Sequence, residues 1–86
     1  MNADKLARMA DQIAAFFATD PDPASASAAV ASHLRRFWDP RMRRAIFAWL
    51  DETGGPGLSP LALQALQEHR ESLLSTTPRN PAPATA

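Results

Sequence analysis

Proline and glycine constrain the fold of this chain most, because they set where regular structure begins and ends. Turn-forming residues cluster at four places: Asp20 to Pro23, Asp39-Pro40, Gly54 to Gly57 and Ser59-Pro60. Proline suits the first position of a helix, and an Asp or Ser before it accepts free N–H groups of the first turn. Alanine is abundant and β-branched residues are scarce. The sequence therefore predicts an all-α fold, a small bundle of three to four helices.

The predicted helices cover about residues 3–18, 24–37, 40–52 and 60–74. Either Asp22 or Ser25 caps the second helix, Asp39 caps the third, and Gly54-Gly55 ends it. Residues from Ser75 onward include three prolines and no bulky apolar side chain, which is typical of a loose chain end. We expect a helical domain over residues 1–74 and a disordered tail over residues 75–86.

Apolar residues recur at helical spacing in all four segments, which predicts one core face on each helix. The second segment opens with small residues, ASASAAVAS, which permit the close approach of another helix. The predicted core stripes are Leu6, Met9, Ile13, Phe16 and Phe17; Val30, Leu34 and Phe37; Met42, Ile46, Trp49 and Leu50; and Leu61, Leu63, Leu66, Leu73 and Leu74.

Composition excludes several function classes. The chain has 86 residues and no cysteine, so it offers no disulfide and no thiolate ligand for a metal cluster. No apolar run approaches the ~20 residues that span a bilayer, and no signal-peptide pattern is visible. His33 and His69 are isolated, and Gly54 to Gly57 follows a helix instead of a strand. We expect a soluble, cytoplasmic protein with no catalytic, metal or cofactor site.

Positive charge and aromatic area are concentrated between His33 and Leu50. Both tryptophans and five of the nine basic residues lie there, although the whole chain has a formal net charge of zero. Tryptophan and arginine are the residue types most enriched at binding hot spots. The candidate partner-binding residues are Arg35, Arg36, Phe37, Trp38, Asp39, Pro40, Arg41, Arg43 and Arg44.

This basic cluster has three interpretations. It forms a solvated face, a nucleic-acid surface of a small helical DNA-binding regulator, or a protein interface. Zero net charge and acidic flanks on both sides argue against nucleic acid. Arg41 and Arg44, three residues apart, act together, whereas Arg43 points toward the side of Phe47. The position of Trp38 before the third helix favours a core or staple role over a contact role.

Two blocks carry a resemblance to a known family: KLARMADQIAAFF from Lys5 to Phe17, and HLRRFWDPRMRRAI from His33 to Ile46. Together with the weaker GLSPLALQAL segment from Gly57 to Leu66, the chain resembles the delta subunit of the cytoplasmic NAD-dependent, molybdenum- or tungsten-containing formate dehydrogenase. The FWDPRMR block is the specific part of this likeness. Asp11 stands where this family has asparagine.

The resemblance implies a non-catalytic accessory subunit that binds the large alpha subunit and supports its assembly, maturation or stability. In such a complex the alpha subunit is expected to carry a bis-pterin molybdenum or tungsten cofactor and iron–sulfur clusters. The beta and gamma subunits are expected to hold FMN, further clusters and the NAD site. The delta subunit itself is expected to bind no cofactor.

Overall fold

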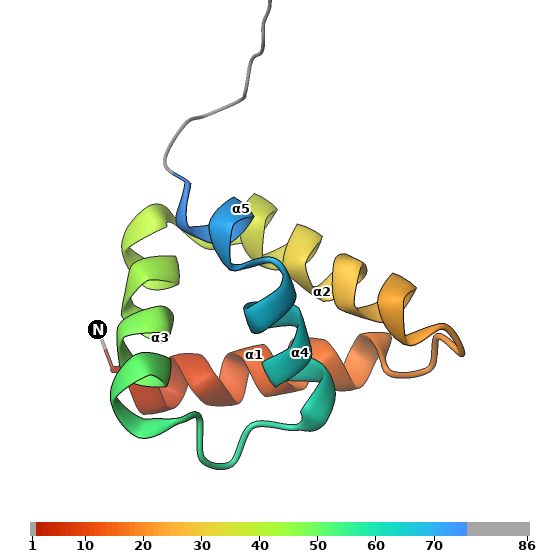
Figure 1. Ribbon diagram of the computed structural model, residues 1–86, viewed down its shortest axis with the longest axis horizontal. Coiled ribbons are helices and arrows are strands. Elements are labelled where there is room, and N and C mark those ends of the chain that lie inside the picture. Colours follow the sequence, from red (N-terminus) through yellow and green to blue (C-terminus); the bar gives the residue numbers. More distant parts are fainter. Residues whose placement is uncertain (1, 76–86) are drawn as a thin grey trace, which may run out of the picture.

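The computed structural model describes residues 2–75, and within this range every regular element is a helix (Figure 1). This confirms the predicted all-α fold. The disordered tail predicted from Ser75 onward falls, beyond Ser75 itself, outside the described residues. The helices are α1 Ala3–Phe17, α2 Pro23–Phe37, α3 Pro40–Thr53, α4 Pro60–Glu68 and α5 Arg70–Leu74.

Three of the helices begin in the predicted way, with an acceptor side chain followed by proline. The Asp22 carboxylate accepts from the Ala24 N–H, the Asp39 carboxylate from the Met42 N–H, and the Ser59 hydroxyl from the Ala62 N–H. Asp22, and not Ser25, is therefore the cap of α2. Each cap satisfies an N–H that has no partner within its helix.

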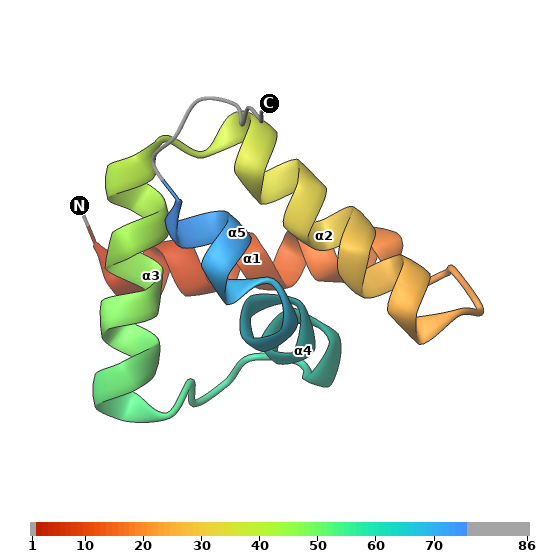
Figure 2. The ribbon, with the colours of Figure 1, turned by 45° about the horizontal axis from the view of Figure 1, so that its top comes forward.

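The helices α4 and α5 pack in the space enclosed by the three longer helices, α1, α2 and α3 (Figures 1 and 2). α1 contacts α2, α3 and α4, while the short α5 lies between α2 and α3. α2 packs closely on α4 through small buried residues, as its alanine-rich start predicted. These residues are Ala26 and Ser27 on α2, and Ala62 and Ala65 on α4.

The loop from α3 to α4 is held at both ends. Gly54 ends α3 in left-handed geometry, with φ 81°, as the sequence predicted. At the other end, the Ser59 N–H donates to the Asp11 carboxylate on α1 over 2.7 Å. An asparagine at position 11 would present the same acceptor oxygen. The departure from the family pattern at this position therefore preserves the contact.

The single helix predicted over residues 60–74 is in fact two helices, α4 and α5, which separate at His69. The backbone of His69 leaves helical geometry, with φ −113° and ψ 23°. On either side of the break, side chains bond in different directions. Glu68 accepts from the Ser27 hydroxyl on α2, and Arg70 binds Asp51 on α3. Tertiary contacts here override a sequence that is locally compatible with one helix.

Candidate partner-binding surface

The core face of α3 shares Ile46 and Leu50 with the predicted stripe and differs from it at the other two positions. Arg43, Ile46, Phe47 and Leu50 are buried, which is the i, i+3, i+4, i+7 pattern of an amphipathic helix. Met42 and Trp49, both predicted as core, are only partly buried. The prediction is wrong at these two positions because the first residue of the buried face is an arginine, Arg43, and arginine normally faces water.

Arg43 is 8% exposed and donates from its Nη1 to the Leu73 carbonyl over 3.0 Å. Arg35, at the end of α2, donates to the Ser72 carbonyl and, over 3.0 Å, to the Ser72 hydroxyl. The last carbonyls of a helix have no partner within it. The two arginines therefore cap the C-terminal end of α5 from neighbouring helices.

Burial, and then repulsion from Arg35, lower the pKa of the Arg43 guanidinium from its ordinary value. An arginine stays charged under such conditions, so Arg43 carries its charge into the domain. Trp38 is also inside, at 5% exposed, and belongs to the core cluster. Three of the nine candidate residues, Arg35, Trp38 and Arg43, thus make their contacts within the chain.

The other six candidate residues are exposed: Arg36, Phe37, Asp39, Pro40, Arg41 and Arg44. Asp39 is occupied as the cap of α3. The guanidinium groups of Arg36, Arg41 and Arg44 make no hydrogen bond or ion pair with any residue from 2 to 75. The structure thus divides the basic cluster into arginines that hold α5 and arginines that are free for other contacts.

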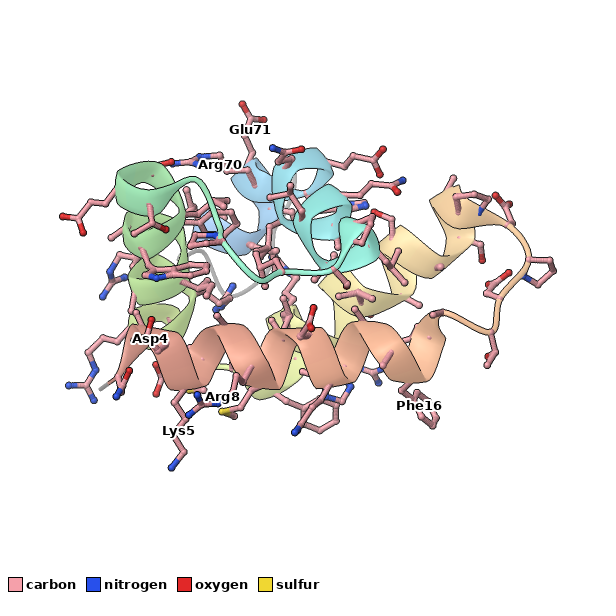
Figure 3. The ribbon with its side chains drawn as sticks, turned by 90° about the horizontal axis from the view of Figure 1, so that it is seen from below. Asp4, Lys5, Arg8, Phe16, Arg70 and Glu71 are labelled. Carbon is pink, nitrogen blue, oxygen red and sulfur yellow. The ribbon has the colours of Figure 1, made fainter. Side chains whose placement is uncertain are left out.

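Four rings lie in succession from the last turn of α1 along the second half of α2. Phe16 and Phe37 are 74% and 69% exposed, and they are the two large hydrophobic side chains most open to water among the described residues. Phe17 lies 5.0 Å from Phe16, and His33 lies 6.2 Å from Phe17 and 4.7 Å from Phe37, between ring centroids. We call Phe16, Phe17, His33 and Phe37 the aromatic patch; Figure 3 shows Phe16 projecting away from the helices.

A groove of about 230 Å³ opens beside these rings. Its residues come from the end of α1 and the second half of α2: Phe17, Ala29, Ser32, His33, Arg36 and Phe37. The polar side chains that line it are a hydroxyl, an imidazole and a guanidinium, and no carboxylate is among them. The groove is therefore lined by aromatic and small residues and holds one arginine with no acidic side chain beside it.

The helical spacing predicts Phe16 and Phe17 in the core, and it places Phe37 in a core stripe although Phe37 is also a candidate partner-binding residue. Phe16 and Phe37 are in fact exposed, and Phe17 is only partly buried. The buried face of α1 is instead made of Leu6 and three alanines, Ala7, Ala10 and Ala14. Small residues let α1 approach its neighbours closely, so the bulkier stripe is turned partly outward. The spacing of these alanines by three and four residues was the signal that could have revealed the true core face.

A second hollow, of about 250 Å³, lies between the N-terminal half of α1 and the α3–α4 loop. Trp49 lines it together with two carboxylates, Asp4 and Asp11, and one arginine, Arg8. Its charges are of both signs, and one Asp11 oxygen is already used by Ser59. Nowhere in residues 2–75 do three acidic or histidine side chains come together in a way that could hold a metal ion.

The acidic end of α3 has a partner within the chain, Arg70 of α5. The Arg70 Nη2 lies 2.6 Å from the Asp51 carboxylate in a two-point contact, and Figure 3 shows Arg70 reaching toward α3. The hydrogen bond from Arg70 lowers the pKa of Asp51. The Arg70 Cζ also lies 5.0 Å from the centre of the buried Phe47 ring. Arg70 therefore fastens α5 to α3.

Comparison with known proteins agrees with the likeness noted in the sequence. Residues 5–66 match the family of the NADH-dependent formate dehydrogenase delta subunit FdsD. The chain belongs to this family. Searches of curated proteins and of solved structures gave no significant match.

The part shared with the delta-subunit family runs from α1 into α4 and includes the whole aromatic patch. It ends before α5, so Arg70 and the carbonyls capped by Arg35 and Arg43 lie beyond it. Among the helices described, none is long and apolar enough to cross a membrane. The family places the chain in a formate dehydrogenase complex of several subunits.

Proposed function

We propose that this chain is a non-catalytic accessory subunit of a cytoplasmic NAD-dependent formate dehydrogenase, and that it binds the large alpha subunit through the aromatic patch. Binding would support the assembly, maturation or stability of that subunit. Membership of the delta-subunit family supports the assignment of the chain to a formate dehydrogenase complex. The observation that carries the proposal is the exposure of Phe16 and Phe37 on one continuous aromatic surface.

The free energy gained by burying phenylalanine favours a partner that covers this patch. Leaving a phenylalanine in water forgoes ~1.5–3 kcal/mol relative to burying it. A small domain has little stability to spare, so two such residues on one patch point to a partner that covers them. Aromatic and arginine side chains at the centre of an interface commonly carry most of the binding energy. Arg36 beside Phe37 supplies this combination.

The redox groups of the complex are assigned in this proposal to the other subunits. A bis-pterin molybdenum or tungsten cofactor and iron–sulfur clusters belong to the alpha subunit, and FMN and further clusters to the beta and gamma subunits. The isolated chain is then expected to be colourless and unable to oxidise formate. Stoichiometric molybdenum, iron or flavin in the purified chain would contradict this assignment.

The test is purification of the tagged chain from its native cytosol, with partners identified by mass spectrometry. We expect the alpha subunit to copurify, and Phe16→Ser combined with Phe37→Ser to remove it. Both changes are at exposed positions, so the helical circular dichroism should be retained. Gln12→Ser with Ala48→Ser, also at exposed helical positions, is the matched control and should retain the partner. Normal recovery of alpha subunit with the phenylalanine variant would contradict the proposal.

The DNA-binding alternative is less well supported by the arrangement of the basic cluster. Arg35 and Arg43 bind carbonyls of α5, which leaves Arg36, Arg41 and Arg44 for contact with phosphates. Salt dependence separates the alternatives, because each phosphate contact steepens the loss of affinity with rising salt. Binding dominated by phenylalanine should change little over the same salt range.

A further inference from the structure

We infer that the groove beside the aromatic patch receives a helix of the large subunit, which inserts an apolar side chain and presents a carboxylate to Arg36. This inference rests on the proposed function and adds the chemistry of the partner segment. The groove that would accept it is lined by Phe17, Ala29, Ser32, His33, Arg36 and Phe37. Three properties of these residues indicate what kind of partner segment binds in the groove.

The first property is the shape and polarity of the groove. Ala29 and Ser32 are small residues on α2, whereas Phe17 and Phe37 at the two helix ends are large rings. A space of about 230 Å³ between small and aromatic residues suits one bulky apolar side chain. Contacts with the edges and faces of the rings would add to the area that such a side chain buries.

The second property is the state of the backbone that lines the groove. Ala29, Ser32 and His33 lie in the interior of α2, where N–H and C=O groups are already bonded within the helix. The groove therefore offers no free strand edge to an extended peptide. A segment that docks here has to satisfy its own backbone hydrogen bonds, and a helix does so.

The third property is charge. The Arg36 guanidinium is exposed and makes no hydrogen bond or ion pair with residues 2–75. No carboxylate is among the lining residues to pair with it. A planar guanidinium binds a carboxylate by two parallel hydrogen bonds. An Asp or Glu about one turn from the apolar anchor would place both groups on the same face of the partner helix.

The same charges argue against a second copy of this chain as the occupant. In a symmetric dimer the same patch meets itself, so the positive Arg36 guanidinium groups of the two copies would be brought to the same surface and repel each other. No carboxylate in the lining would offset the repulsion. The groove thus fits an acidic partner better than it fits itself.

The experiment measures binding of the purified large subunit to immobilised full-length chain. Arg36→Glu should weaken binding by roughly tenfold or more, since a charge-assisted contact becomes a repulsion. Arg36→Lys should keep the charge and lose only part of the affinity. The matched control is Lys5→Glu, the same change in charge on an exposed side chain. Lys5 projects from the same side of α1 as Phe16 but near its other end (Figure 3), and this variant should bind normally.

A photo-crosslinking phenylalanine analogue at Phe37, in the assembled complex, then identifies the segment that covers the groove. We expect one helical peptide of the large subunit that carries a bulky apolar residue and an acidic residue about one turn away. Wild-type affinity of Arg36→Glu, with binding still lost in the Phe16→Ser and Phe37→Ser variant, would overturn the inference and leave the proposed function standing. Crosslinks to a second copy of the chain would also overturn it. Retained binding in both variants would overturn the proposed function as well.

Discussion

Arg43 and Arg44 are adjacent in the sequence and have opposite environments. Arg43 is buried and donates to the Leu73 carbonyl, with no bonding partner for its Nε in the described structure. Arg44 is exposed. A buried guanidinium whose hydrogen-bonding capacity is only partly used contributes to stability through the carbonyl it caps and through packing of its stem.

Arg43→Ala should destabilise the domain by about 1–3 kcal/mol, because it leaves a buried carbonyl without its donor. Arg44→Ala should stay within about 0.5 kcal/mol of the wild type, since an exposed side chain with few contacts contributes little. Urea denaturation followed by circular dichroism measures both. Equal effects of the two substitutions would show that Arg43 does not hold α5.

Trp38 and Phe37 form a second adjacent pair with opposite environments. Trp38→Ala removes a core side chain at a cost of ~3–5 kcal/mol, about the whole stability expected of so small a core. The isolated variant should therefore be largely unfolded. Phe37→Ala, at an exposed position, should melt close to the wild type in the same assay. A folded Trp38→Ala chain that no longer binds the large subunit would instead assign Trp38 to the interface.

At the scale of elements, α5 is the helix most dependent on its neighbours. It has five residues and no side-chain N-cap, and isolated helices of this length do not persist in water. Contacts from Arg35, Arg43 and Asp51 hold it between α2 and α3. Its stability is therefore tertiary, and it should respond to changes on the other helices.

The pair of Asp51 and Arg70 predicts a pH dependence. The pKa of Asp51 is lowered from 3.8 in the folded chain, chiefly by the hydrogen bond from Arg70. Its contribution to stability is therefore present above 3.8 and is lost as the pH falls through the lowered pKa. The melting temperature of Asp51→Asn should be slightly below that of the wild type at neutral pH and equal to it in strong acid. A difference that persists in strong acid would mean that the pair does not titrate in this way.

Local signals predicted the helix starts, and long-range contacts decided the rest. Asp39 caps α3 through an N–H three residues away, so the sequence alone contains that contact. The break at His69 depends on contacts of Glu68 and Arg70 with residues far away in the chain. The burial of Arg43 likewise depends on α5, thirty residues later. No local pattern encodes contacts of this kind.

At the scale of the whole molecule, the surface formed by the last turn of α1 and the second half of α2 carries the two most exposed large hydrophobic side chains of the described residues. The buried face of α1 consists mainly of alanines, and α2 and α4 also bury small residues. Phe16 and Phe37 lie outside this packing, whereas Phe17 is partly buried against it. A domain built in this way has a closely packed interior and a separate, exposed aromatic surface, which is the surface that we propose for the partner.

The central claim is that this aromatic surface is open in the free chain and covered in the complex. Hydroxyl-radical footprinting with mass spectrometry measures the reactivity of individual side chains in both states. Phe16 and Phe37 should lose reactivity several-fold on assembly with the large subunit, while Trp49, at the other hollow, should be unchanged. Unaltered reactivity of Phe16 and Phe37, with protection of Trp49 instead, would contradict the account.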